Sequence, residues 1–208
     1  MLAAGSRARA AAAAAATVLT LTPLSACSSD VPARGGSTPP PTPIGRLNTA
    51  QLELHRIPFC DLLSPQAMTD ALGGRPSARA TWGEGGRSRQ FGARGDLAQE
   101  FGCRFGAGSA VAAAWVFASP VEVGFARKVI ADSADNSRCR DEPGTTFGSP
   151  GELQVCRLPG GGVRVRHAGL FGQTWLTCEV SDREPERDVA RRAGGWCVQV
   201  ANVLNTSR

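Results

Sequence analysis

The runs LQVCRL (153–158) and VRVRH (163–167), joined across GGG (160–162), decide the fold of this 208-residue chain. In both runs apolar and polar side chains alternate, which is the period of a β-strand with one buried face. A glycine-rich turn between two such runs is typical of a β-hairpin. The segment 171–180 follows as a third strand, so this part of the chain predicts antiparallel sheet.

Two more strands are expected upstream, at 101–105 and 111–118, joined by a turn through GAGS (106–109). A first helix is expected just after position 64. Ser64 suits its N-cap, Pro65 its first position and Gly73 its stop.

A second helix is expected after Ser119, because Ser119 and Glu122 have the spacing of a capping box. Val121, Phe125 and Val129 recur every four residues and are expected to form its buried stripe.

The third helix is expected over 183–204. A glycine pair at 194–195 either weakens this helix or lets it pack closely on the sheet. Six side chains fall on one face and are expected in the core: Val189, Ala193, Trp196, Cys197, Val200 and Leu204.

This order of elements predicts an α+β domain, an antiparallel sheet of about five strands with helices packed on one face. We divide the chain into a lipoprotein signal peptide (1–26), a Pro/Ser/Thr-rich tether (27–50) and a single domain (51–206). Prolines, glycines and small polar residues keep such a tether extended and solvated.

The N-terminal segment is typical of a bacterial secretion signal. Arg7 and Arg9 precede a charge-free apolar run, 10–21, that is too short to cross a bilayer. LSAC (24–27) then matches the lipobox of lipoproteins, in which the cysteine, here Cys27, carries a diacylglyceryl group. The expected location is the extracytoplasmic face of the cell membrane, with the membrane as a partner through the anchor. The alternative is an ordinary secretory signal cleaved before an unmodified Cys27.

Six cysteines remain beside the lipobox cysteine, and an even number in an exported chain predicts disulfides, here three. No C-x-x-C motif occurs among them, so no metal site is expected. Six cysteines allow 15 pairings, so their number alone leaves the connectivity open. They are Cys60, Cys103, Cys139, Cys156, Cys178 and Cys197.

No catalytic constellation is recognisable. The Gly-x-Ser-x-Gly elbow of serine hydrolases is absent, and His167 lies inside an expected strand, where a histidine is usually structural. Paired cysteines leave no thiolate, and neither a phosphate loop nor a dinucleotide fingerprint occurs, so no cofactor is expected. The formal charge of +5 includes two signal-peptide arginines and is too small to indicate a nucleic-acid partner.

The segment 74–100 is rich in glycine and arginine and leaves two interpretations open. It is either a solvated loop or a basic surface that contacts phospholipid head groups or an anionic wall polymer. The candidate contacts of such a surface are Trp82, Arg87, Arg89, Phe91 and Arg94.

The stretch IPFCDLLSP (57–65), followed by ALG (71–73), resembles the opening of an actinobacterial lipoprotein family of unassigned function. Its members have a lipobox, a Pro/Ser/Thr tether, a Pro-x-Cys-x-Leu-Leu-Ser/Thr-Pro motif and a second cysteine two residues before an aromatic. CRF (103–105) fits that second element, with phenylalanine where tryptophan is usual. The long Gly/Arg insert and four further cysteines depart from the pattern.

The resemblance implies a Cys60–Cys103 disulfide. For the other four cysteines we expect Cys139–Cys156 and Cys178–Cys197, the latter joining a strand to the last helix where both face the core. The family implies no substrate and no active site. We therefore expect a non-catalytic domain that either binds an envelope protein, a lipid or a wall polymer, or is a structural accessory without a ligand. The alternative is an envelope hydrolase that acts on wall or lipid, and the sequence does not decide the oligomeric state.

Overall fold

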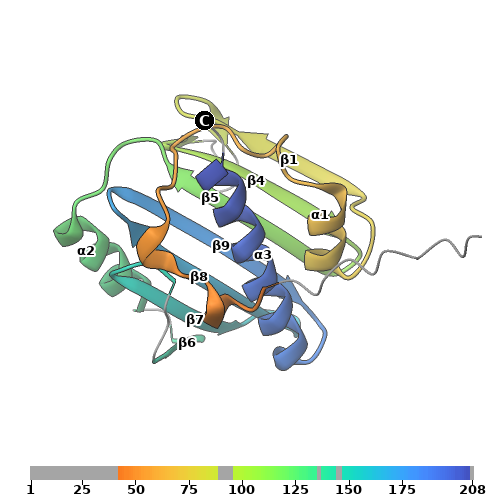
Figure 1. Ribbon diagram of the computed structural model, residues 1–208. Helices are drawn as coiled ribbons and strands as arrows, with labels where there is room; N and C mark the ends of the chain where they lie inside the picture. The colour runs from red at the N-terminus through yellow and green to blue at the C-terminus, as the bar shows by residue number, and fades with distance from the viewer. Residues whose placement is uncertain (1–41, 89–95, 135–136, 144–146, 207–208) are drawn as a thin grey trace, which may run out of the picture. The chain divides into compact units, whose positions relative to one another are not determined.

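The computed structural model describes residues 42–88, 96–134, 137–143 and 147–206, and seven strands within these ranges form one antiparallel sheet. The strand order is β1-β4-β5-β9-β8-β7-β6, and Figure 1 shows the sheet behind two helices. The strands are β1 (Ala78–Trp82), β4 (Glu100–Ala107), β5 (Ala110–Phe117), β6 (Cys139–Glu142), β7 (Gly151–Arg157), β8 (Val163–Phe171) and β9 (Thr174–Asp182). A separate two-stranded ribbon pairs β2 (Arg87–Ser88) with β3 (Asp96–Leu97).

The five expected strands are confirmed as β4, β5, β7, β8 and β9, but the sheet has seven strands and not five. The two extra strands, β1 and β6, lie at the two edges of the sheet. Most side chains of β1 are exposed, and β6 has the polar sequence CRDE, so neither shows the alternation that reveals a half-buried strand.

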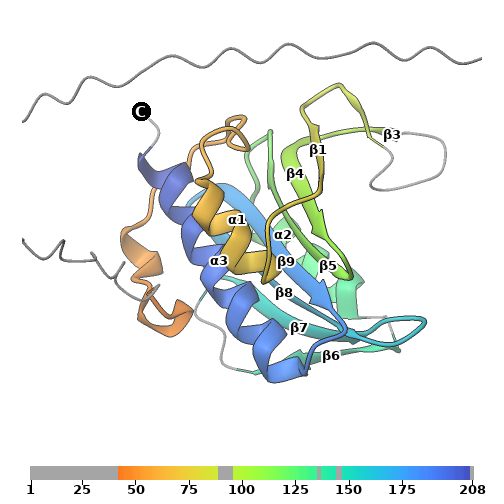
Figure 2. The ribbon, with the colours of Figure 1, turned by 90° about the vertical axis from the view of Figure 1, so that its right-hand side faces the viewer.

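The three α-helices of the described ranges are α1 (Pro65–Leu72), α2 (Val123–Ala134) and α3 (Glu186–Thr206). Two short 3-10 turns, η1 (Ile44–Arg46) and η2 (Thr49–Gln51), precede them. Figure 2, turned by 90° from Figure 1, shows α1 and α3 side by side over one face of the sheet.

The caps of α1 are those expected from the sequence. The Ser64 hydroxyl accepts a hydrogen bond from the Ala67 backbone N–H at 3.1 Å, and Pro65 is the first helical residue. Gly73 ends the helix with a φ of 69°, a left-handed conformation that favours glycine.

The buried stripe of α3 is also confirmed. All six residues expected on its core face are at most 1% exposed. Trp196 is the largest of them; its indole N–H donates to the Ala113 carbonyl at 2.9 Å, and its ring meets Phe105 edge-on. Helix α3 therefore closes the main core over the middle of the sheet.

The expectation that all helices pack on one face is wrong for α2. Side chains along a strand alternate between faces, and Phe171 and Leu176 belong to the core under α3. Leu170 and Trp175, their neighbours in sequence, belong to a second cluster with Val121 and Ala126. Helix α2 therefore covers part of the opposite face.

The expected stripe of α2 is wrong at one position. Phe125 is 53% exposed, with its ring centroid 6.5 Å from that of Phe117, while Ala126 is fully buried. The helix begins at Val123 rather than directly after the Ser119 cap, and its inward face is turned by one residue from the expected one.

Two of the three expected disulfides are present in the described part of the chain. Cys139–Cys156 joins directly opposite residues of β6 and β7, and Cys178–Cys197 joins β9 to α3. Cys60 and Cys103 are adjacent buried thiols and are not bonded to each other.

The segment that leads into the domain is in contact with it. Ile44, Leu47 and Leu52 are partly buried against the main core, although the first two lie in the stretch expected as tether. The backbone N–H of His55 donates to the Leu204 carbonyl near the end of α3. None of the helices in the described ranges has the length and hydropathy of a bilayer-crossing segment.

Candidate functional site: a groove between α1, α3 and η1

A groove of about 450 Å³ lies where α1, α3 and the chain entering η1 meet. Small-molecule sites in proteins are usually hollows of about 300–1,000 Å³ with mostly apolar walls, and this groove fits that description. Its lining residues are Thr42, Pro43, Ile44, Ala67, Asp70, Ala71, Ala190, Arg191, Arg192, Gly194, Gly195, Trp196 and Gln199.

Two glycines of α3 explain why there is space here. A Cβ on Gly194 would stand 3.2 Å from Cγ2 of Ile44, so the missing side chain lets the entering segment lie on the helix. A Cβ on Gly195 would meet nothing within 4 Å. Gly194 therefore makes room for η1, and Gly195 leaves space in the groove. The sequence-based alternative, that the glycine pair lets α3 pack closely on the sheet, does not apply.

The facing helix contributes small side chains. Ala67 and Ala71 lie one turn apart on α1, and both are buried. Ala190 of α3 adds a third methyl group to the wall. Because none of these side chains extends beyond Cβ, the helices leave a channel between them instead of interdigitating.

One buried charge borders the groove, and it is paired. Arg192 donates from Nη2 to Oδ2 of Asp182 at 2.6 Å, and the other carboxylate oxygen accepts from Ser109 and from the Arg183 backbone. Burial by itself raises the pKa of Asp182, but these donors outweigh it, so the pKa lies below its ordinary value.

The polar groups at the groove surface are water-exposed. Arg191 is 73% exposed and lies 3.7 Å from Asp188. Asp70 is exposed and accepts a hydrogen bond from the Gln66 amide. Exposed pairs of this kind contribute little to stability, so these groups are available to a ligand.

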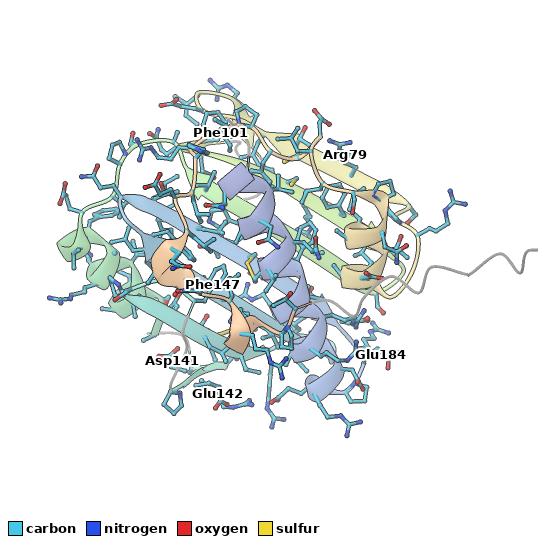
Figure 3. All side chains as sticks on the ribbon, in the orientation of Figure 1. Arg79, Phe101, Asp141, Glu142, Phe147 and Glu184 are labelled. Atoms are coloured by element: carbon cyan, nitrogen blue, oxygen red, sulfur yellow. A yellow bond between two sulfur atoms is a disulfide. The ribbon has the colours of Figure 1, made fainter. Side chains whose placement is uncertain are left out.

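His167 takes no part in this groove. It is 5% exposed, and its ring lies 6.0 Å from Phe147, which Figure 3 labels inside the domain. Burial lowers its pKa to about 4, and its Nδ1 has no hydrogen-bond partner. Its register partners, Leu153 and Cys178, carry no charge. It is a neutral core histidine.

Trp82 and Arg87, the two described candidate contacts of the segment 74–100, do not line the groove. Trp82 ends β1, and its indole N–H donates to the Glu100 carboxylate at 3.2 Å. Burial raises the pKa of Glu100, and the bond from Trp82 opposes that rise. Arg87 lies in β2, whereas Arg89, Phe91 and Arg94 lie outside the described residues.

Another cluster surrounds the two free thiols. Asp61, next to Cys60, forms an ion pair with Arg79 of β1, which Figure 3 labels, and the Arg79 guanidinium also lies over the Phe105 ring. Burial raises the pKa of Cys103, and the adjacent Cys60 raises it further. Cys103 is therefore a protonated thiol and no nucleophile in this state.

Sequence reasoning did not find the groove. Its residues come from three separate segments, and none of them carries a motif. One signal was present, since the glycine pair and Ala190 on α3 could be matched with Ala67 and Ala71 on α1 as two small-residue faces. In the described ranges, no three metal-ligating side chains come together.

Comparisons with known proteins place few constraints on this chain. No family model matches it, and no curated protein matches it. Among solved structures, it is similar to the extracellular domain of PknH from Mycobacterium tuberculosis, with 13% sequence identity and a TM-score of 0.44. That similarity covers 76% of this chain and all of the other.

Proposed function

We propose that this chain is a cell-envelope lipoprotein whose domain binds a ligand or partner in the groove without transforming it. The observation that carries the proposal is the chemistry of the groove wall. Apolar side chains dominate it, and none of its lining residues is a serine, cysteine or histidine. The groove offers contact area and little to activate a nucleophile.

The proposed location rests on the N-terminal segment and on the cysteines. Cys27 closes the lipobox and is the proposed lipid attachment site, which puts the domain on the extracytoplasmic face of the membrane. Two disulfides support an oxidising compartment. We propose that Cys60 and Cys103, already adjacent, form the third.

The alternative, an envelope hydrolase, would need a general base near a hollow in which substrate binds. His167 is the histidine that sequence reasoning considered for that role. Its burial, its low pKa and its absence from the groove wall favour the binding function.

Site-specific photo-crosslinking in living cells tests the proposal on the full chain. A photoreactive phenylalanine derivative replaces Gln199 in the groove, and in the matched control it replaces the exposed Arg127 on α2. We expect an ultraviolet-dependent adduct at position 199 that is absent at position 127. The same adducts at both positions would contradict a specific binding groove.

Fractionation of the same cells tests the anchor. Cys27→Ala is expected to release the protein from the membrane fraction into the medium. Retention of the variant with the membranes would refute anchoring through this cysteine, whatever the crosslinks show.

A further inference from the structure

We infer that the groove between α1, α3 and η1 holds an acyl chain of a lipid from the membrane to which the chain is tethered. This inference rests on the proposed function and names its ligand class. It follows from the hydrogen-bonding state of the groove wall, from the room beside Gly195 and from the position of the tether.

Within the part of the chain that the structure describes, no buried polar side-chain atom of the groove wall lacks a hydrogen-bond partner. Four buried side-chain atoms among the described residues lack a hydrogen-bond partner, and they belong to His55, Arg164, Arg166 and His167. None of these residues lines the groove. A polar metabolite would therefore lose its hydration against an already satisfied wall, whereas a hydrocarbon chain loses nothing there.

The wall suits a narrow and unbranched apolar group. Ala67, Ala71, Ala190 and the two α3 glycines make it smooth, and the space beside Gly195 is empty to at least 4 Å from the position of a Cβ. Each methylene group buried in such a site contributes about 0.8 kcal/mol. A peptide helix, in contrast, would need the knobs and holes of larger side chains.

The groove surface suits a polar head group. Arg191 and Gln199 offer donors, and Thr42 and Asp70 offer oxygen atoms, next to the apolar wall. Arg191 is largely exposed and shares only a 3.7 Å contact with Asp188, so a phosphate or carboxylate head can reach it. Apolar walls beside exposed polar groups match an amphiphile.

The position of the tether supplies the source of the ligand. Thr42, Pro43 and Ile44 form one wall of the groove, and the first of them lies fifteen residues after Cys27. A segment of that length reaches at most about 50 Å when fully extended. The length of the chain therefore keeps the groove within about 50 Å of the anchored cysteine.

The test is photo-crosslinking with a palmitic acid analogue that carries a diazirine and a terminal alkyne. Cells that make the full-length protein take up the analogue, are irradiated, and the protein is purified through the alkyne. Mass spectrometry then locates the adducts. Metabolic acylation of Cys27 gives label without light, so light-dependent adducts on peptides of α1 and α3 report the groove.

Gly195→Leu is the blocking variant, since the new side chain occupies empty space in the groove. Gly124→Leu is the matched control, because Gly124 is also a helical glycine with nothing within 4 Å, on α2 at the opposite face. Ala190→Leu blocks the groove from a second position, should one of the variants not fold.

We expect light-dependent adducts on peptides of α1 and α3, reduced about tenfold by Gly195→Leu, since losing two methylene groups from the groove suffices for that. Gly124→Leu is expected to keep the wild-type level. Adducts elsewhere, or adducts that Gly195→Leu and Ala190→Leu leave unchanged, would overturn the inference. Label at Cys27 without light-dependent adducts would overturn it while leaving the anchor intact, and no label at Cys27 would refute the anchor.

Discussion

Asp182 and Arg192 form an ion pair at 2.6 Å in which each side chain is only 8% exposed. The pair ties the end of β9 to the N-terminal third of α3. The remaining carboxylate oxygen accepts from Ser109, which lies in the turn between β4 and β5, so three elements meet at this one carboxylate. A Cβ on Gly73 would stand 3.0 Å from Nη1 of Arg192, which brings the end of α1 to the same place.

Arg192→Met is expected to lower the free energy of unfolding by about 3–5 kcal/mol at pH 7, because it leaves a buried carboxylate without its counter-charge. Arg191→Met, at the next position, is the matched control, and it should change stability by less than about 0.5 kcal/mol since Arg191 is exposed. Urea denaturation of both variants measures the difference. Equal losses in the free energy of unfolding for the two variants would show that the buried pair contributes no more to stability than an exposed arginine.

The free energy of unfolding is expected to fall as the pH drops from 6.5 to 4, because the buried His167 resists protonation in the folded state. The unfolded chain binds a proton on this histidine below its ordinary pKa of 6.5, whereas the folded chain does so only below about 4. Between these values the unfolded state binds more protons, so the free energy of unfolding falls, by up to about 3 kcal/mol.

His167→Leu should remove most of that slope while keeping the core filled. Unfolding midpoints in urea at several pH values from 7 to 4.5, for wild type and variant, test this expectation. Parallel curves for the two proteins would mean that another group causes the pH dependence.

Gly102→Ala is expected to displace Trp82 from the sheet. A Cβ on Gly102 would stand 2.8 Å from the indole Nε1 of Trp82, which is held there by Glu100. We expect a loss of about 1–3 kcal/mol in the free energy of unfolding. Gly106→Ala, in the same strand, is the control, because its nearest neighbour would be at an ordinary 3.6 Å. Thermal unfolding compares the two, and equal effects would refute the role given to Trp82.

The exported protein is expected to show no free thiol among its six domain cysteines. Cys60 and Cys103 are adjacent buried thiols, so we expect them to pair with each other on oxidation. Alkylation of the unreduced protein followed by mass measurement counts the thiols. Two alkylated cysteines at positions 60 and 103 would show that this pair stays reduced, whereas six would argue against export.

The central part of the fold could be predicted because its residues carry local patterns. Three kinds of pattern are visible within short windows of the sequence. They are the alternation of 153–158 and 163–167, the helix caps Ser64 and Gly73, and the apolar stripe of α3. Those features placed β7, β8, α1 and α3 correctly, and similar apolar runs at 101–105, 111–118 and 171–180 placed β4, β5 and β9.

The two edge strands, the buried face of α2 and the groove depend on contacts between distant segments of the chain. β1 and β6 are strands because a neighbour offers hydrogen bonds, and their own side chains give no sign of it. Phe125 fitted an apolar stripe, yet Ala126 is the residue that α2 buries. The groove exists because α1, α3 and the chain at Ile44 meet, and no sequence window contains all three.

The order of the elements along the chain also bears on when the domain can complete its folding. Helix α3 is the last element of the described residues, yet Val189, Trp196 and Leu204 fill the core on the middle of the sheet. A chain made from its N-terminus has all of its strands before it has this helix, so their apolar face stays uncovered until Leu204 has emerged. Cys178 must likewise wait for Cys197, nineteen residues later. The nascent chain is therefore most prone to aggregation between the synthesis of β9 and that of α3, and a variant that cannot form α3 would keep the apolar face of the sheet exposed.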